Sequence, residues 1–406
     1  MLALQGAADG AGAIAGRRVA ITGVGVVAAC GIGAEDFWAG LLGPAPTTLQ
    51  RRVENFDARA IYGPKEIRRV DAFTQFAAVA AEEAVEDAGG PDALRGDPDR
   101  AGVIIGTGVG GLDTLQEQTK VLLERGSRRV NPFLVPMIMG NRAAADVSMR
   151  YGMRGPCEAT VTACAAGTHS VGNAARLIAT GRCDVVLAGS AEAPLSDIGV
   201  AGFANMTALS TSGVSMPFDT RRDGFVIGEG AGILVLEELE RARARGARVY
   251  AEIAGAASTA DAHHITAPSP GGSGAVSCME LALRDAGLTP DQVRHVNAHG
   301  TSTPLNDSAE AEALTKVFGT PGPAVTSIKG ITGHSLGAAG SLEAVALALS
   351  FARRLIPPTA GLEQLDPDMQ IDVVTGGPRA WTPGPSLSNS FGFGGHNGTL
   401  VYVALD

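Results

Sequence analysis

Large aromatic side chains are scarce in this sequence: Phe, Trp and Tyr make up 4% of its 406 residues, whereas glycine occurs 55 times. A core with so few rings must be packed by close approach of the backbone, which favours layers of helices and sheets over a β-sandwich. The chain is also long enough for two domains, or for one large duplicated fold with an ample core.

Cysteine and positive charge are in short supply as well. The five cysteines are an odd set without C-x-x-C spacing, which argues against a disulfide framework and a zinc site and is typical of a reducing cytoplasm. The net charge of −10 gives no overall attraction to nucleic acid or to acidic membranes. An acidic partner must therefore bind to a local basic patch, and we expect no bound metal.

Long apolar runs are missing too. None reaches the roughly 18 residues that a membrane-spanning helix needs. The first 16 residues also lack the basic start and the strongly apolar middle of a signal peptide. We interpret residues 1–16 as a flexible N-terminal tail and expect a cytoplasmic protein.

The chain is organised around residues 158–169, which read Glu-Ala-Thr-Val-Thr-Ala-Cys-Ala-Ala-Gly-Thr-His. Their first half favours a strand, and residues 165–181 predict a helix of small and apolar residues that ends at a glycine. Cys164 would then lie at the turn into the helix, where free N–H groups and the helix dipole favour a thiolate. Such a place suits a nucleophile, although most cysteines in apolar runs are core residues.

A second segment rich in Ala and Gly, residues 335–350, resembles residues 165–181. Both are apolar on nearly all sides, and such a helix must be buried between layers. We therefore predict an internally duplicated α/β fold in which two equivalent helices lie side by side between two sheets. The N-terminal half would be residues 17–249, with the nucleophile, and the C-terminal half would be residues 250–406.

Two strand-to-helix turns carry the glycine patterns Gly23-x-Gly25 and Gly106-x-Gly108-x-x-Gly111, which are similar to the fingerprint of dinucleotide-binding proteins. The first lacks the acidic residue that should end a second strand about 20 residues further on. We interpret both as sites of close packing, the second under a substrate channel. An amphipathic helix is expected at residues 71–89 and a further helix at residues 132–149.

Three further turns follow predicted strands, so they could meet Cys164 at one edge of the sheets. Two of them carry His299 and His334, and the third carries Phe393. A thiol with two imidazoles can perform acyl transfer: the thiolate accepts an acyl group, the imidazoles supply protons or hydrogen bonds, and backbone N–H groups hold an oxyanion. The turns are residues 297–303, 327–337 and 389–397.

A serine nucleophile is the alternative that the residues leave open. Gly333-His-Ser335-Leu-Gly337 fits the G-x-S-x-G elbow of serine hydrolases and acyltransferases, and an acid and then His396 follow it in the expected order. Reaction with a fluorophosphonate rather than with a thiol alkylator would favour this alternative.

Taken together, the motifs resemble the β-ketoacyl-acyl-carrier-protein synthases, of the fatty acid elongation type called synthase II. From Arg17 to the C-terminus the matching segments are T-A-C-A-A-G-T-H, G-F-V-I-G-E-G-A-G, V-N-A-H-G-T-S-T-P, K-G-I-T-G-H-S-L-G-A-A-G and N-S-F-G-F-G-G-H-N. The resemblance implies the five-layer αβαβα thiolase fold, a homodimer and no cofactor. It also implies decarboxylative Claisen condensation of an acyl-enzyme thioester with malonyl-acyl-carrier protein.

The resemblance implies a role for each matching residue. Cys164 would accept the acyl chain from a phosphopantetheine thioester, while His299 and His334 would bind the malonyl carbonyl and promote decarboxylation. The N–H groups of Cys164 and Phe393 would form the oxyanion hole, with Phe393 as a gate, and His169 would be structural. Lys329 would pair with Glu343, since a buried lysine without a partner is costly. Also implied are pantetheine contacts at Thr301 and Thr303, an acyl pocket at Val109, Leu134 and Phe203, and a structural network of Asp307, Glu310 and Glu343.

The acyl carrier protein is acidic in this family, so it should dock on local basic clusters. Thr207 stands where arginine occurs in relatives, which weakens that part of the docking surface. The expected docking residues are Lys65, Arg68, Arg69, Arg128 and Arg129.

Some segments are closer to ketosynthase subunits of aromatic or polyene polyketide systems. They are Leu305-Asn306-Asp307 and residues 193–196 and 250–255. A ketosynthase subunit of a type II polyketide synthase, paired with a chain-length partner, is therefore the second hypothesis. A non-catalytic chain-length partner typically lacks the cysteine, and Cys164 argues against that third possibility.

Overall fold

Twelve strands of the described chain form one hydrogen-bonded order, β13-β11-β10-β15-β16-β9-β1-β8-β6-β4-β5, with β2 beside β1. The structure is a computed structural model that describes residues 16–405, so the expected tail lies outside the described residues apart from Gly16. We call the part before residue 250 the first half and the remainder the second half.

The elements of the first half alternate strands and helices, as the sequence pattern predicts. They are β1 (Val19–Ala28), β2 (Gly31–Ile32), α1 (Ala34–Leu41), β3 (Gln50–Arg51), α2 (Ala72–Asp87), β4 (Ala101–Gly106), α3 (Leu112–Arg125), α4 (Leu134–Ile138), α5 (Arg142–Tyr151), β5 (Cys157–Glu158), α6 (Ala166–Ala179), β6 (Val185–Glu192), α7 (Asp197–Asn205), β7 (Ile227–Gly228), β8 (Gly230–Glu238) and α8 (Leu239–Ala244).

The second half repeats this alternation with fewer helices. Its elements are β9 (Ala251–Ala260), α9 (Ser273–Asp285), β10 (His295–Asn297), α10 (Pro304–Phe318), β11 (Ala324–Thr326), α11 (Lys329–Thr332), α12 (Ala339–Arg353), β12 (Leu355–Ile356), β13 (Asp372–Val373), β14 (Arg379–Ala380), β15 (Ser386–Gly392) and β16 (His396–Val403).

The strand directions confirm the predicted internal duplication. In the first half β1 is antiparallel to β8 and β8 to β6, whereas β6 is parallel to β4 and β4 to β5. In the second half β9 is antiparallel to β16 and β16 to β15, whereas β15 is parallel to β10 and β10 to β11. The same order of directions therefore occurs twice.

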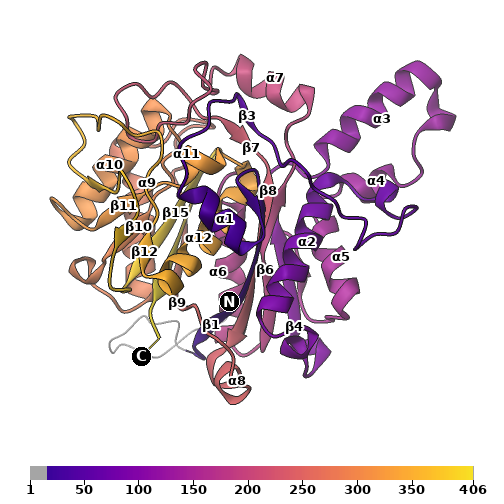
Figure 1. Ribbon diagram of the computed structural model, residues 1–406, viewed down its shortest axis with the longest axis horizontal. Coiled ribbons are helices and arrows are strands. Elements are labelled where there is room, and N and C mark those ends of the chain that lie inside the picture. Colours follow the sequence, from indigo (N-terminus) through magenta and orange to yellow (C-terminus); the bar gives the residue numbers. More distant parts are fainter. Residues whose placement is uncertain (1–15, 406) are drawn as a thin grey trace, which may run out of the picture.

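The two half-sheets, between which the sequence predicted the central helices to lie, are joined through β1 and β9. On one side the ten-residue strand β1 pairs with β8 from Val19 to Ala28. On its other side the start of β1 pairs with β9 through Val19–Ile253, Ala20–Glu252 and Ile21–Ala251, and its end pairs with β2. The join is short because the two half-sheets diverge beyond these residues to make room for the central helices (Figure 1).

The helices lie in three layers around the half-sheets. Figure 1 shows α6 and α12 in the middle, α2 and α5 outside the first half-sheet, and α9 and α10 outside the second. Both central helices contact strands of both halves. The five-layer αβαβα arrangement is therefore confirmed, with α6 and α12 as the equivalent helices expected at residues 165–181 and 335–350.

Glycine lets the two central helices cross in close contact. A Cβ atom on Gly167 of α6 would lie 2.6 Å from the backbone nitrogen of Ser341, and one on Gly340 of α12 would lie 2.6 Å from that of Thr168. Two hydroxyl pairs fix the crossing, Ser190 with Ser341 at 2.6 Å and Ser390 with Thr168 at 2.7 Å. Backbone approach thus replaces large rings in this core.

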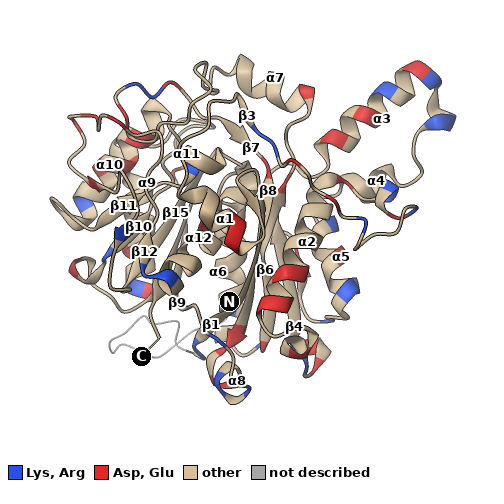
Figure 2. Cartoon of the chain, viewed as in Figure 1, with Lys and Arg blue, Asp and Glu red and all other residues tan. Residues whose placement is uncertain are grey.

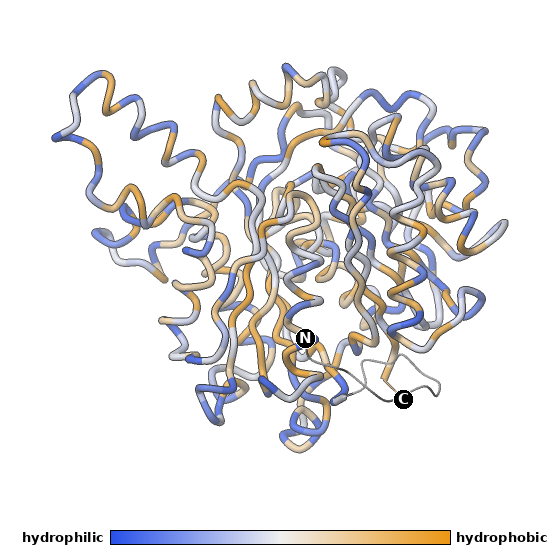
Figure 3. The backbone as a smooth tube through the Cα atoms, turned by 180° about the vertical axis from the view of Figure 1, so that it is seen from behind, coloured by the Kyte–Doolittle hydropathy of each residue, from blue (hydrophilic) through white to orange (hydrophobic). Residues whose placement is uncertain are grey.

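Hydrophobic residues concentrate in the strands and the central layer, while charged residues lie toward the periphery (Figures 2 and 3). Within the described chain one segment, Leu336–Arg353, is long and apolar enough to cross a membrane, but 89% of it is buried inside the fold. It is the central helix α12 with its preceding turn, so its apolar surface already packs against the protein.

The helix predicted at residues 132–149 is wrong in one respect, because the chain forms two helices there. α4 ends after Ile138, Met139 is extended with φ −64° and ψ 129°, and α5 begins at Arg142. A Cβ atom on Gly140 would lie 3.3 Å from the Thr107 methyl group, so the break brings the backbone against the loop after β4. The helix predicted at residues 71–89 is α2, with Asp71 as its N-cap.

Candidate active site

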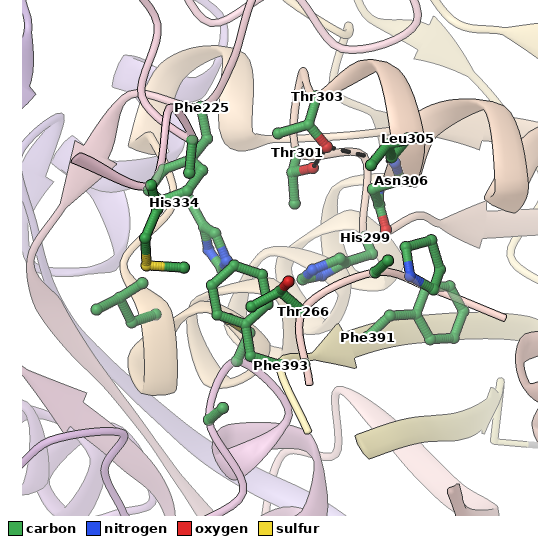
Figure 4. Close-up of a pocket in the computed structure, with 18 of the residues that line it drawn as sticks. Phe225, Thr266, His299, Thr301, Thr303, Leu305, Asn306, His334, Phe391 and Phe393 are labelled. Atoms are coloured by element: carbon green, nitrogen blue, oxygen red, sulfur yellow. Dashed lines mark hydrogen bonds between the residues drawn. The ribbon is translucent and has the colours of Figure 1, made fainter. Parts of the chain in front are cut away.

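A cavity of about 480 Å³ opens where the two halves meet, at the ends of β4, β10 and β15. Turns from both halves line it. Figure 4 shows the imidazoles of His299 and His334 pointing into the same space, with the ring of Phe393 beside them. Of the residues expected at the site, Cys164, His299, His334, Phe393, Thr301, Thr303, Val109 and Phe203 line this cavity.

Cys164 lies in the turn that leads into α6, at the place that the sequence predicts. The preceding residue, Ala163, has a φ of +48°, so the backbone reverses sharply before the helix begins. The imidazole of His169, one turn into α6, uses both ring nitrogens, bonding Thr162 at 2.8 Å and the Asn397 carbonyl at 3.0 Å. His169 therefore holds the turn in place, as expected for a structural residue.

The thiol of Cys164 is not pre-ionised, which differs from the prediction. Burial raises the pKa of Cys164 to about 11, although the backbone N–H of Phe393, the charge of Lys329 and its own N–H each lower it. Desolvation of the sulfur outweighs the favourable turn because the side chain is only 6% exposed. Cys164 therefore rests as a thiol when no substrate is bound.

Two backbone N–H groups act on the sulfur of Cys164, those of Phe393 and of Cys164 itself. The end of β15 reaches the cysteine because its last residue is a glycine: a Cβ atom on Gly392 would lie 3.1 Å from the Cys164 nitrogen and 3.0 Å from the Thr162 oxygen. Donors in this position can stabilise negative charge on an oxygen next to the sulfur.

His299 and His334 come from different elements of the second half. His299 follows β10, whereas His334 follows α11. The backbone N–H of His334 donates to the Val226 carbonyl at 2.7 Å. The two ring centroids are 5.3 Å apart at nearly a right angle, and the His334 ring also packs on Phe225 at 5.2 Å. One polar group between the rings could thus contact both.

Both imidazoles are neutral in the free protein. Burial lowers the pKa of His299 and that of His334 well below the usual 6.5, and the positive charge of Lys329 lowers both further. A neutral imidazole carries one N–H, so each ring can donate one hydrogen bond to a substrate oxygen.

Lys329 lies behind the histidines and does not line the cavity. Its ammonium group forms an ion pair with Glu343 of α12 and donates to the His299 carbonyl at 2.6 Å. Burial raises the pKa of Glu343 and the lysine lowers it. The lysine thus links the central helix to the backbone that carries His299.

Glu310 and Asp307 hold the turn after β10 from the first turns of α10. The Glu310 carboxylate accepts the N–H groups of His299 at 2.8 Å and Gly300 at 2.7 Å, and burial raises its pKa to about 7. Asp307 accepts the N–H of Ser302 at 3.2 Å and that of Phe218 at 2.9 Å. Both carboxylates therefore act on the backbone.

The other expected contacts fall into two groups. The hydroxyls of Thr301 and Thr303 bond each other at 2.9 Å at the cavity wall, and Val109 and Phe203 line its apolar part. Leu134 does not line the cavity: it is half-buried in the first turn of α4. Leu134 therefore lies outside the wall of this cavity.

The expected docking residues are all exposed and lie on short helical turns near α3 and α4. The guanidinium of Arg69 stacks on the ring of Phe133 at 4.4 Å, which brings residues 65–69 next to the start of α4. Figure 2 shows basic residues at the outer end of α3, where Arg128 and Arg129 follow. The two clusters thus border the same projecting part of the first half.

The arrangement gives no support to a serine nucleophile. The Ser335 hydroxyl is fully buried, has no hydrogen-bond partner in the described chain and does not line the cavity. The glycines after β4 and in β1 serve packing, as interpreted: Gly25, for example, faces the backbone of α2 at Ala80.

One buried acid near the site was missed by the sequence analysis. Glu192, at the end of β6, is fully buried and accepts hydrogen bonds from Gly108 and Val109, which line the cavity, and from the neighbouring Thr107 and Gly337. The sequence could have shown it as an acid at the end of a strongly apolar strand, where an unpaired carboxylate would be costly.

The chain matches two family models, described as the β-ketoacyl synthase N-terminal domain over residues 43–242 and the C-terminal domain over residues 250–363. A protein of Synechocystis named 3-oxoacyl-[acyl-carrier-protein] synthase 2 is 44% identical over 407 residues, covering 95% of this chain and 98% of that protein. A protein of the same name from Staphylococcus aureus is 43% identical over 410 residues, covering 96% and 99%.

Solved structures of high similarity include the ishigamide ketosynthase/chain length factor, with a TM-score of 0.90 and 34% identity over 97% of this chain and 100% of the other. A β-ketoacyl synthase from Burkholderia phymatum has a TM-score of 0.87 and 34% identity over 96% and 100%. A type II polyketide ketosynthase in complex with its acyl-carrier protein has a TM-score of 0.85 and 32% identity over 96% and 100%.

Proposed function

This chain belongs to the β-ketoacyl synthase family, as its motifs predicted, and we propose from this membership that it elongates fatty acids. The reaction is the condensation of an acyl-enzyme thioester with malonyl-acyl-carrier protein, with loss of CO₂, to give a β-ketoacyl-acyl-carrier protein. The observation that carries the proposal is that Cys164, His299 and His334 line the same cavity. The enzyme is thus an acyltransferase.

In the first step the sulfur of Cys164 attacks the carbonyl carbon of an acyl-carrier thioester. The bond from that carbon to the pantetheine sulfur breaks, and the proton of the Cys164 thiol passes to the departing pantetheine thiolate. The N–H groups of Cys164 and Phe393 stabilise the oxyanion that forms in between. Because the free thiol has a raised pKa, the attack depends on proton transfer to the leaving group rather than on a standing thiolate.

In the second step malonyl-acyl-carrier protein enters between the imidazoles. His299 and His334 each donate an N–H to the malonyl thioester oxygen, which stabilises the enolate formed when the carbon–carbon bond to the carboxylate breaks and CO₂ leaves. The enolate carbon then attacks the acyl-Cys164 carbonyl, and the cysteine leaves as a thiolate that takes up a proton. Neutral imidazoles suit this role because the substrate oxygen needs donors.

The remaining site residues position the pantetheine arm and the acyl chain. Thr301 and Thr303 bond the pantetheine arm at the cavity wall, Val109 and Phe203 contact the acyl chain, and Phe393 opens or closes the way between them. The proposed steps need no cofactor, because both substrates arrive on phosphopantetheine. A cytoplasmic location fits the five cysteines, none of which is paired.

We also propose an acyl carrier protein as the partner that delivers both substrates. One similar ketosynthase was solved with its acyl-carrier protein. On this chain the exposed basic residues beside α3 and α4 would attract an acidic carrier, in spite of the net charge of −10.

A homodimer is proposed as the working form. The strand β5 ends the sheet order and both its residues are exposed, so its edge can pair with a second copy. Exposed apolar side chains also occur in the first half: Val135 is 63%, Val161 57% and Met139 44% exposed. Replacing Val135 and Val161 together by Asp should give a monomer in sedimentation velocity, and an unchanged sedimentation coefficient would contradict this dimer.

Condensation of defined acyl-carrier thioesters with malonyl-acyl-carrier protein, read by mass spectrometry, tests the function. Cys164→Ala and Cys164→Gln should both lose the acyl-enzyme and the condensation product. Malonyl decarboxylation should persist in Cys164→Gln, because the histidines that stabilise the enolate are intact. Full condensing activity in Cys164→Ala would overturn the assignment.

The polyketide hypothesis keeps one specific observation in its favour, the similarity to solved ketosynthases, of which one is from a type II polyketide synthase and one is a ketosynthase/chain length factor. The two functions differ in the number of condensations that occur without reduction of the keto group. With excess malonyl-acyl-carrier protein and no reductase, an elongation enzyme should add one two-carbon unit. A ladder of unreduced products, formed when a chain-length partner is added, would favour the polyketide function.

A further inference from the structure

Glu192 connects two segments of the cavity wall that are far apart in the sequence. Its Oε1 accepts the hydroxyl of Thr107 at 2.8 Å and the N–H of Val109 at 3.2 Å. Its Oε2 accepts the N–H of Gly108 at 2.5 Å and that of Gly337 at 2.9 Å. The carboxylate thus joins the loop after β4 to the turn before α12.

Both joined segments line the cavity. Gly108 and Val109 form part of the wall from the first half, and Leu336 forms part of it from the second. Leu336 has a φ of +47°, a backbone conformation that is unfavourable for a branched residue and persists only where neighbouring contacts hold it. The bond from Gly337 to Glu192 is such a contact, because it fixes the peptide that follows Leu336.

The backbone of each wall segment lies too close to Glu192 to leave room for a side chain at Gly108 or Gly337. A Cβ atom on Gly108 or on Gly337 would lie 2.6 Å from Oε2 of Glu192. Both glycines are therefore required for the carboxylate to reach the two backbones at once, and a change at Glu192 acts on both segments.

An ionised carboxylate is the side chain that this site suits. Three N–H groups and one hydroxyl converge on Glu192, and a carboxylate accepts from all of them. A glutamine of the same shape would place an NH₂ group against at least one N–H donor, and a buried donor that loses its acceptor is destabilised. Burial raises the pKa of Glu192 to about 7 and its four donors lower it.

We propose that Glu192 is a positioning residue that sets the acyl chain length accepted by the cavity, by holding Val109 and Leu336 in fixed places in its wall. The inference rests on the proposed function, since it assumes that this cavity holds the acyl chain of acyl-Cys164. Glu192 touches neither substrate nor sulfur in this role. It acts through the backbone of the two wall segments.

The test compares acyl-enzyme formation on Cys164 with C6 and C14 acyl-carrier thioesters, read by intact mass. In Glu192→Gln the wall loosens, and the C14-to-C6 rate ratio should rise about tenfold, within the range by which pocket shape discriminates apolar groups. Glu192→Asp keeps the charge but shortens the reach, so its ratio should lie between wild type and Glu192→Gln. The ratio cancels changes in the reactivity of the thiol itself, because one sulfur reacts with both substrates.

Glu237→Gln is the matched control, since Glu237 is an equally buried carboxylate on β8 that pairs with Arg241 and Arg245 away from the cavity. It should lower the melting temperature without moving the ratio. If Glu192→Gln does not fold, Thr107→Val, which removes one donor, replaces it and should raise the ratio less. An unchanged ratio in a folded variant would overturn the inference, whereas absence of any acyl-enzyme in wild type would overturn the proposed function instead.

Discussion

The two halves make the same turn before their central helix and use it differently. Ala163 and Leu336 each stand four residues before the glycine at which α6 and α12 cross, and their φ angles are +48° and +47°. In the first half the next residue is Cys164, whose N–H acts on its own sulfur. In the second half the next residue is Gly337, whose N–H donates to Glu192.

The strand that meets each turn differs in the same way. β6 ends at Glu192, which fills the space beside Gly337, whereas β15 ends at Gly392, which leaves the space beside Cys164 open. In the turn before α12, the N–H of Gly337 is thus already bonded to a carboxylate, and this turn forms part of the cavity wall. In the turn before α6, the N–H groups of Cys164 and Phe393 remain available for an oxyanion.

The largest effect is expected from breaking the buried ion pair between Lys329 and Glu343 in the second half. Glu343 has a lysine partner, whereas Glu192 of the first half is held by neutral donors alone. Lys329→Met leaves the Glu343 carboxylate buried and unpaired, which should cost about 3–5 kcal/mol of unfolding free energy. Urea denaturation measures this loss.

The matched variant for that prediction removes both charges. Lys329→Met combined with Glu343→Leu should recover much of the lost stability, since two apolar residues leave no unpaired charge. If the double variant is as unstable as the sum of the single variants, the pair is not the source of the effect.

The second prediction concerns a substitution that fills the space beside Cys164, as Glu192 fills the space beside Gly337. Gly392→Ala places a methyl group 3.1 Å from the Cys164 nitrogen, so the oxyanion donors are displaced or covered. Loss of one such donor should lower kcat about 100-fold. Steady-state condensation measures it, and Gly63→Ala, where a Cβ atom meets nothing within 4 Å, is the control that should retain full activity. A kcat within twofold of wild type in Gly392→Ala would argue against an oxyanion hole here.

The third prediction compares how the two halves titrate. Burial raises the pKa of Cys164 to about 11, so the thiolate fraction, and with it the rate of iodoacetamide alkylation, should rise about tenfold for each pH unit between roughly pH 7 and 9. Burial lowers the pKa of His299 and His334 well below 6.5, so their ring NMR signals should not move between about pH 6 and 9, whereas an imidazole of ordinary pKa would titrate there. The variants His299→Gln and His334→Gln assign the signals.

The same pKa shifts of His299 and His334 determine how the stability of the protein changes with pH. The two histidines bind fewer protons in the folded state than in the unfolded chain below pH 6.5, so they reduce stability as the pH falls through that value. Ring signals that titrate near pH 6.5 would show that the imidazoles are not desolvated in solution.

The sequence predicted the parts of this site that depend on local turns after strands. Cys164, His299, His334 and Phe393 each follow a predicted strand or turn, and the edge of a sheet brings such turns together whatever their separation in the chain. The resemblance between residues 165–181 and 335–350 predicted the duplication, because two wholly apolar helices need a shared buried layer.

What the sequence did not predict depends on packing in three dimensions. The pKa of Cys164 was expected to fall, and burial reverses the direction. Glu192 escaped notice because its partners lie 83 to 85 residues before it and 145 after it. The break in the helix at residues 132–149 follows from the contact of Gly140 with Thr107, which no local pattern shows.

The smallest expected effect concerns the mouth of the cavity. Thr207, after α7, is exposed and lines the opening. Thr207→Arg adds a positive charge that can meet an acidic carrier, and a rim pair of this kind is worth about 0.5–1 kcal/mol, a two- to fivefold lower KM at low salt. Thr207→Gln, of similar length without charge, and acyl-pantetheine, which brings no carrier protein, should both show no gain. A gain that persists at 1 M salt would mean that the arginine acts through packing, because about 1 M salt reduces the screening length to about 3 Å.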